Sequence, residues 1–129
     1  MARIMIVDDH RDIVDTLQTI AEKEGNITET ASNGEEFLKK IGAFNPDLVL
    51  LDVMMPGLTT RQILEKLKER GLGNQKIVLV TVVRFSEEEE KALFKEFKIA
   101  DYVTKPFDLF EMTDIIHKQL GKRKKITSA

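Results

Sequence analysis

Short apolar segments alternate along this chain with stretches of helical periodicity, and this alternation restricts the folds that the chain can adopt. Near-continuous apolar segments are typical of strands in a parallel sheet that helices cover on both faces. The helical stretches would supply the crossover connections that parallel strands require. The segments that we expect to be strands are Arg3–Val7, Ile27–Ala31, Leu48–Leu51, Lys76–Val80 and Ala100–Thr104.

A strand followed by a helix, repeated five times, predicts an α/β fold with a doubly wound, five-stranded parallel sheet. Right-handed crossovers favour the flavodoxin-like strand order 2-1-3-4-5 for a sheet of this size. In that order the first and third strands are neighbours, and the switch point of the topology lies at their carboxyl ends.

Several residues indicate where the helices begin and end. Ser32–Glu35 and Ser86–Glu89 have the spacing of capping boxes. Asp108 is expected to cap the last helix, and Asp12 is a suitable cap for the first. The expected helix ends are at Gly25-Asn26, Asn45-Pro46 and Gly71–Gly73.

The length and composition describe an ordinary globular domain. The chain has 129 residues, which suits one hydrophobic core, and a net charge of −2, which gives no general attraction to nucleic acid or anionic membranes. It has no cysteine, so disulfides and thiolate metal sites are excluded. Without a long apolar segment or room for a signal peptide, we expect one cytoplasmic domain over residues 1–121 and a short basic tail over residues 122–129.

Carboxylates follow two of the expected strands directly. Asp8 and Asp9 end the first strand and Asp52 ends the third, so the predicted topology gathers them at one edge of the sheet. An Asp after a strand is usually a cap or turn residue. Asp12 could cap the first helix as well, however, and three converging carboxylates repel one another without a cation. Oxygen ligands favour a hard ion, above all Mg²⁺.

The same edge holds the other groups that phosphoryl transfer needs. A carboxylate can act as the nucleophile and form an aspartyl-phosphate, and Asp52 on the central strand is the natural candidate. Thr81 would donate a hydroxyl hydrogen bond, and Lys105 would pair with a phosphoryl oxygen.

At this point the chain resembles the receiver domain of two-component response regulators. The matching motifs are Val7-Asp-Asp9, Leu50-Leu-Asp-Val-Met-Met-Pro-Gly57, Thr81 after the fourth strand and Tyr102-Val-Thr-Lys-Pro-Phe107. The resemblance covers essentially residues 2–120. The joint spacing of these motifs is specific to this family, whereas any one motif alone would be weak evidence.

The resemblance implies a phosphoacceptor at Asp52, which takes its phosphoryl group from a histidine kinase or a phosphotransfer protein. Asp9, Asp52 and the backbone carbonyl of Met54 would be direct Mg²⁺ ligands, and Asp8 would act through a water. Such a domain is a switch that catalyses only its own phosphorylation and dephosphorylation, not an enzyme with a separate substrate.

The resemblance also implies how the phosphorylated state is sensed. Thr81 and Tyr102 would form the switch pair, with the hydroxyl moving to the phosphoryl group and the ring turning inward. Lys105 would contact the phosphate, and Pro106 would follow it through a cis peptide bond. The face formed by the fourth helix, fifth strand and fifth helix would then change its affinity for an unknown effector protein.

Some positions depart from the family pattern. Val82 stands where Ala or Gly is usual, and its methyl groups should crowd the phosphodonor or the hydrolytic water. Met54 and Val83, at the positions that tune water access, cannot orient a water. We therefore expect slow turnover of the phosphoryl group. Leu58-Thr-Thr60 replaces a frequent Asp-Gly, which leaves the conformation of that loop open.

Alternative functions remain at this stage. A receiver that never turns over would serve only as a binding module, although all five chemical positions are filled here. An aspartyl phosphatase usually has a second Asp two residues after the nucleophile, where this chain has Met54. A nucleotide or flavin site would need a glycine-rich loop after the first strand, which is absent.

The remaining expectations concern partners and less informative residues. We expect no DNA-binding domain, no membrane contact, and a monomer or weak dimer. His10 adjoins the acidic pair but is expected to be a solvated loop residue, and His117 is expected on the exposed side of the last helix. Glu87–Glu90 is expected to be a solvated first turn, with docking as the less favoured alternative.

Overall fold

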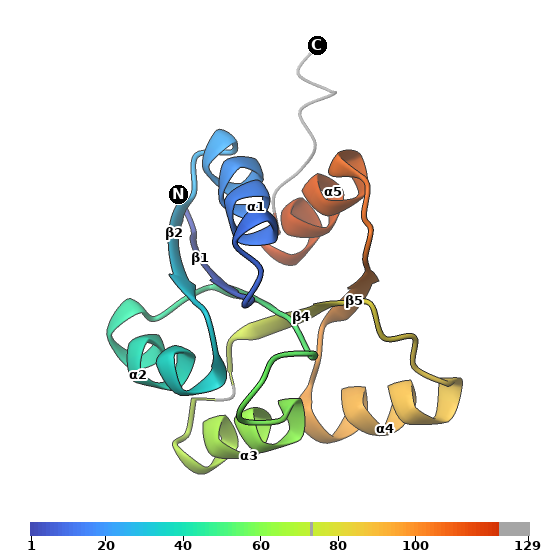
Figure 1. The fold of residues 1–129 in the computed structure, drawn as a ribbon. Coiled ribbons are helices and arrows are strands. Elements are labelled where there is room, and N and C mark those ends of the chain that lie inside the picture. Colours follow the sequence, from blue (N-terminus) through green and yellow to red (C-terminus); the bar gives the residue numbers. More distant parts are fainter. Residues whose placement is uncertain (73, 122–129) are drawn as a thin grey trace.

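A five-stranded parallel sheet organises the computed structural model, which describes residues 1–72 and 74–121. The strand order is β2-β1-β3-β4-β5, so the predicted fold class and strand order are confirmed (Figure 1). The strands are β1 (Arg3–Val7), β2 (Ile27–Ala31), β3 (Leu48–Leu51), β4 (Lys76–Thr81) and β5 (Asp101–Thr104).

Helices cover both faces of this sheet. α1 and α5 lie on one face, and α2, α3 and α4 lie on the other (Figure 1). The helices are α1 (Arg11–Lys23), α2 (Gly34–Phe44), α3 (Thr60–Glu69), α4 (Glu87–Phe97) and α5 (Leu109–Gln119).

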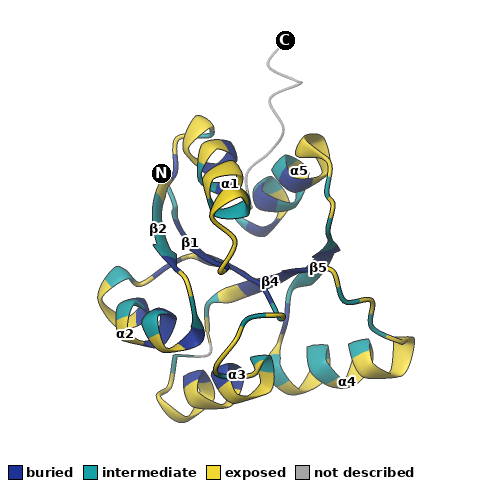
Figure 2. Ribbon diagram, in the orientation of Figure 1, coloured by how far each residue is buried: buried dark blue, intermediate teal, exposed yellow. Residues whose placement is uncertain are grey.

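Two hydrophobic clusters follow from this arrangement, one on each face of the sheet. Because side chains alternate along a strand, Met5 and Val7 point into the cluster beneath α2 and α3, while Ile4 and Ile6 point into the cluster beneath α1 and α5. Every residue of β3 is buried, and so is every residue of β4 after Lys76, as Figure 2 shows for β4. The central strands therefore give their carboxyl ends a rigid support.

Two helix starts show the capping chemistry that the sequence predicts. The Ser86 hydroxyl accepts a hydrogen bond from the Glu89 amide, and the Glu89 carboxylate accepts one from the Ser86 amide, which confirms the capping box. Asp108 accepts two amide hydrogen bonds at the start of α5, as predicted. An additional capping box, formed by Thr59 and Gln62, begins α3.

The predicted caps of α1 and α2 are wrong. Asn33, and not Ser32, caps α2 by accepting a hydrogen bond from the Glu36 amide. Ser32 donates instead, through its amide and its hydroxyl, to the Glu36 carboxylate. At α1 the capping position belongs to His10, whose side chain makes no capping hydrogen bond, and Asp12 lies within the first turn.

Other chain features can be placed only within the described residues. Gly71 adopts a left-handed conformation just after α3, as expected of a helix end, whereas Gly73 lies outside the described residues. The predicted tail over residues 122–129 also lies outside them. Among the residues that the structure describes, no helix combines the length and the hydrophobicity needed to cross a membrane.

Candidate functional site

The acidic edge of the sheet is built by extending the strand pairing by one residue. Val7 of β1 lies opposite Leu51 of β3. One residue further, the amide of Asp52 donates a hydrogen bond to the carbonyl of Val7 at 2.9 Å. In the same way, the amide of Asp8 donates to the carbonyl of Ala31 at 3.1 Å. Backbone hydrogen bonds thus fix both carboxylates at the carboxyl ends of neighbouring strands.

The predicted convergence of carboxylates is confirmed. Asp8, Asp9, Asp52 and also His10 each offer one ligand atom, and these atoms lie within 4.8 Å of one another. Asp8 and Asp52 are only 2% exposed, so water cannot screen their mutual repulsion well. Carboxylate oxygens gathered at this spacing fit a hard divalent ion such as Mg²⁺.

Asp52 is a buried carboxylate whose surroundings disfavour its charged form. Its Oδ1 accepts a hydrogen bond from the Met54 amide at 3.1 Å, whereas its Oδ2 is buried and has no hydrogen-bond donor among the described residues. Burial raises the pKa of Asp52, and the charge of Asp8 raises it further, while the Met54 amide and Lys105 act in the opposite direction. A buried oxygen without a donor fits a site that receives a cation or a phosphoryl group.

Lys105 supplies a positive charge at this edge, as predicted. Its Nζ lies 2.7 Å from Asp8 Oδ2 and 3.7 Å from Asp52 Oδ2, and its side chain is nearly buried. The amide of Lys105 donates to the carbonyl of Thr81, which anchors the end of β5 beside β4. The Lys105–Pro106 peptide bond is cis, as predicted. One ammonium cannot neutralise three ionised carboxylates, so the site keeps a net negative charge that a divalent cation could balance.

Thr81 and Tyr102 lie on the two strands next to the acidic edge. The Thr81 side chain is fully buried, and its oxygen accepts a hydrogen bond from the Val83 amide at 3.0 Å. Tyr102 is half-buried, and its ring meets Phe85 and Phe94 edge-on, with centroids 5.5 Å and 6.1 Å away. The structure thus gives both residues defined contacts, and their switching roles stay predictions.

His10 makes contacts with the acidic residues that the sequence does not reveal. Asp8 Oδ1 accepts a hydrogen bond from the His10 amide at 2.9 Å, so Asp8 also has a structural role in the loop before α1. His10 is 65% exposed, as expected of a loop residue, but its ring does not point freely into solvent. Its Nδ1 lies 3.2 Å from a carboxylate oxygen of Asp8 and 3.2 Å from one of Asp9.

The prediction that His117 lies on the exposed side of the last helix is wrong. Its side chain is 18% exposed and contacts the Glu24 carboxylate at the end of α1, instead of facing solvent. Helical periodicity placed it one position after the buried Ile116, and only the packing of α5 against α1 reveals that this position faces a neighbouring helix.

The departures from the family pattern have clear positions. Val82 is 60% exposed and Val83 is half-buried, both directly after Thr81. In the loop before α3, Gly57 adopts a positive φ of 92°, and Thr59 begins the helix with its capping box. Local capping chemistry therefore orders the loop segment whose conformation the sequence left open.

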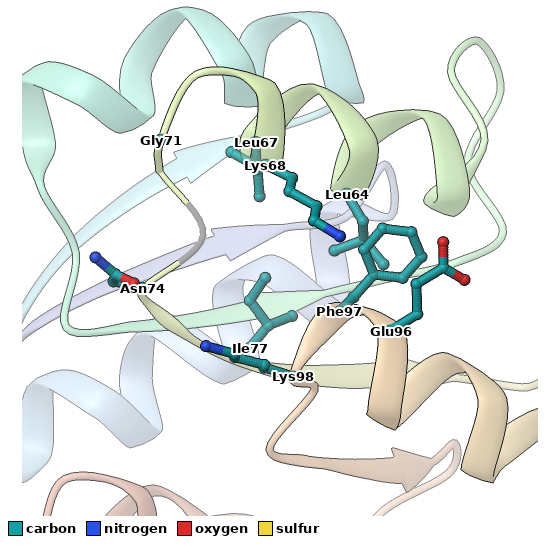
Figure 3. Close-up of a pocket in the computed structure, with 9 residues that line it drawn as sticks. All are labelled: Leu64, Leu67, Lys68, Gly71, Asn74, Ile77, Glu96, Phe97 and Lys98. Atoms are coloured by element: carbon teal, nitrogen blue, oxygen red, sulfur yellow. The ribbon is translucent and has the colours of Figure 1, made fainter.

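A separate hollow of about 320 Å³ lies between α3 and α4, near the amino end of β4 (Figure 3). Leu64, Leu67, Ile77 and Phe97 form its apolar lining. Among the described residues that line it, Glu96 is the only acid, and it is paired with Arg61 at 3.0 Å. The hollow contains none of the predicted chemical residues, so the acidic edge is the better candidate for the functional site.

Comparison with known proteins connects this edge to a family. A model of the response regulator receiver domain matches residues 4–117. The alkaline phosphatase synthesis transcriptional regulatory protein PhoP of Bacillus subtilis is 40% identical over 105 residues, which are 81% of this chain and 42% of PhoP. Sporulation initiation phosphotransferase F of Bacillus subtilis is 33% identical over 118 residues, 92% of this chain and 93% of that protein.

The solved structures agree. The response regulator TrrA of Thermotoga maritima, solved in complex with Mg²⁺-BeF, has a TM-score of 0.76 and 33% identity, with 92% of this chain and 99% of TrrA covered. The chain spans less than half of PhoP but almost the whole of sporulation initiation phosphotransferase F and TrrA.

Proposed function

The chain belongs to the response regulator receiver domain family, and from this premise we propose that Asp52 accepts a phosphoryl group in a two-component phosphorelay. The observation that supports this most directly is the buried Asp52 Oδ2, which has no donor among the described residues and lies beside Lys105 and two further carboxylates. Receiver domains bind Mg²⁺ at their acidic pocket, and the oxygen donors gathered here fit that ion.

The proposed reaction forms one bond and breaks one. Asp52 Oδ2 bonds to the phosphorus of a phosphohistidine as the bond from phosphorus to the donor's imidazole nitrogen breaks. The electron pair of the broken bond stays on that nitrogen, which takes up a proton from solvent. Mg²⁺, when bound, neutralises the charge on the phosphoryl oxygens. Asp9, Asp52 and the carbonyl of Met54 would hold the ion directly, and Asp8 through a water.

The residues around Asp52 would report its new state. Lys105 Nζ lies close enough to the Asp52 carboxylate to bind a phosphoryl oxygen there after a small movement. Thr81 would turn its hydroxyl to the same group, and Tyr102 would follow into the vacated space. Pro106 would hold the end of β5 in place. The face formed by α4, β5 and α5 would then change its affinity for an effector.

Val82 would set the lifetime of the phosphorylated state. Its exposed side chain directly follows the buried Thr81, and its methyl groups would border the approach to the site. An attacking water has to enter along this approach. Neither Met54 nor Val83 carries a group that could orient that water. Turnover is therefore proposed to be slow.

The biological setting of the switch is inferred from the same chemistry. The phosphodonor would be a histidine kinase or a phosphotransfer protein, and the output would be binding to an effector protein, not turnover of a substrate. We assign the receiver domain to residues 1–121 and a basic tail to residues 122–129. The switch would act in the cytoplasm as a monomer or weak dimer.

Incubation with acetyl phosphate and Mg²⁺ tests the proposal, with the intact mass as the readout. We expect the mass to rise by one phosphoryl group, and the gain to disappear when Mg²⁺ is chelated or when Asp52 is replaced in Asp52→Asn. Asp12→Asn is a matched control, since Asp12 is an exposed aspartate in the first turn of α1. A gain that survives in Asp52→Asn would refute the assignment of the phosphoacceptor.

A further inference from the structure

His10 is held against the acidic edge by two separate contacts. The backbone amide of His10 donates a hydrogen bond to Asp8 Oδ1 at 2.9 Å, which fixes the position of the His10 backbone. The ring nitrogen Nδ1 then lies 3.2 Å from Asp8 Oδ1 and 3.2 Å from Asp9 Oδ1. An imidazole nitrogen therefore faces the same space as the carboxylates.

These separations suit ligands of a single metal ion. Bonds of about 2.0–2.2 Å place neighbouring ligands of an octahedral ion roughly 3 Å apart. The Nδ1–oxygen separations of 3.2 Å match this spacing, and the complete donor set lies within 4.8 Å. Independently, Asp52, a member of this donor set, has a buried Oδ2 with no hydrogen-bond donor among the described residues.

We propose that His10 Nδ1 is a direct ligand of the divalent cation at this edge, and that the site therefore favours later transition-metal ions such as Co²⁺ and Ni²⁺ over Mg²⁺. The inference rests on the metal site of the proposed function and adds a nitrogen to its oxygen donors. Imidazole suits the later transition metals, whereas Mg²⁺ and Mn²⁺ prefer oxygen and water ligands. His10 thus contributes more to the binding of Co²⁺ than to that of Mg²⁺.

A different role for His10 makes a different prediction. If its ring only donates hydrogen bonds to Asp8 and Asp9, it orients the carboxylates without touching the ion. Removing the ring would then weaken every divalent ion to a similar degree. The ratio of the Co²⁺ and Mg²⁺ affinities therefore separates a ligand from an orienting residue.

Calorimetric titration of the whole chain with Mg²⁺, Mn²⁺ or Co²⁺ measures this ratio without any phosphodonor. We expect His10→Ala to weaken Co²⁺ binding by about tenfold or more, the range seen when a metal site loses one supporting group, and to change Mg²⁺ binding far less. The matched control is His117→Gln. His117 is the other of the two histidines in the chain, and it contacts Glu24 between α1 and α5.

Pulsed electron paramagnetic resonance of the Mn²⁺-loaded wild-type chain tests the bond between the ion and His10 Nδ1. This measurement does not depend on whether a variant folds. We expect a coupling from an imidazole nitrogen, changed by ¹⁵N-histidine labelling. Bound Mn²⁺ without such a coupling, or an equal loss of all ions in His10→Ala, would overturn the ligand assignment and leave the Asp52 phosphoacceptor intact. If the wild-type chain bound no divalent ion, both the ligand and the proposed metal site would be refuted.

Discussion

At the scale of single residues, Asp52 combines burial with like-charged neighbours, and this combination has a cost in folding stability. Removing a carboxylate from water disfavours its charged form, and Asp8 adds repulsion. The Met54 amide and Lys105 compensate this in part. A group needed for folding alone would not be placed in this way. Strain of this kind is common where function requires a reactive group.

Asp52→Asn is therefore expected to stabilise the metal-free chain. The amide carries no charge, so it relieves the repulsion with Asp8 and Asp9 while it can still accept the Met54 hydrogen bond. We expect the free energy of unfolding in urea to rise by about 0.5–2 kcal/mol, a range typical of substitutions that relieve a functional site. A fall in stability without Mg²⁺ would show that the carboxylate is instead a net stabilising group.

Val82→Ala tests the proposed control of turnover. Loss of two methyl groups should open the approach to Asp52, so both phosphorylation by acetyl phosphate and loss of the phosphoryl group should become faster. Because Val82 is largely exposed, the free energy of unfolding should change by only about 0.5 kcal/mol. The rates follow from the intact mass over time, and two unchanged rates would refute the crowding argument.

At the scale of elements, the start of α2 is held by an ionic cluster. The Glu36 carboxylate accepts hydrogen bonds from the Ser32 amide and hydroxyl, and it pairs with Lys40 at 2.9 Å. The Ser32 amide makes the largest contribution, followed by Lys40, and together with the Ser32 hydroxyl they lower the pKa of Glu36 to about 2. The Lys40 amine also donates to the Thr30 carbonyl of β2, so the cluster connects α2 to the edge of the sheet.

This cluster predicts a specific pH dependence. Because folding lowers the pKa of Glu36 from 4.5 to about 2, its stabilisation is complete above pH 4.5 and is lost as the pH falls toward 2. The stability gap between the wild-type chain and Glu36→Gln, measured in urea, should close over that window. Solvent screening keeps the gap near or below about 1 kcal/mol. A gap that persists unchanged at pH 2 would contradict the ionic origin.

The helix caps show where the prediction of elements from sequence ends. Ser86–Glu89 was identified correctly because its spacing occurs once at that helix start. At α2 both Ser32–Glu35 and Asn33–Glu36 have the capping spacing, and only the extended backbone of Asn33 decides between them. The capping residues of α1 and α3 were not recognised, since a residue such as Thr59 carries no signal until its turn is known.

At the scale of the whole molecule, the strand order and the acidic edge could be predicted for the same reason. Parallel strands bring their carboxyl ends to one edge, so chain positions alone place Asp8, Asp9 and Asp52 together. The contacts of His10 and His117 could not be predicted in this way. They depend on side-chain directions and on how α1 packs against α5, which the periodicity of one helix does not contain.

The architecture also distributes stability unevenly. β1 and β3 are central strands, and all of their residues except Arg3 are buried. In contrast, α4 has no buried residue, as Figure 2 shows. α4 is attached through half-buried side chains such as Phe94 and Phe97, and through the Glu96 carboxylate, to which Arg61 Nη1 of α3 donates at 3.0 Å. A helix attached by so few buried contacts can move without disturbing the core, which fits the place of α4 in the proposed switching face.

Hydrogen exchange in the native state should reveal this gradient. We expect the amides of α4 to exchange through local opening, and those of β1 and β3 to exchange only on global unfolding. Arg61→Gln should speed exchange in α4 selectively, because it removes the ion pair with Glu96 and the contact of the guanidinium with the Phe97 ring, 5.2 Å from its centroid. Lys66→Gln is a control on the same helix, since Lys66 is exposed and lies near the end of α3. Equal protection of α4 and the central strands would mean that the molecule opens only as one cooperative unit, and a light attachment of α4 could not then account for the proposed response of the face to phosphorylation.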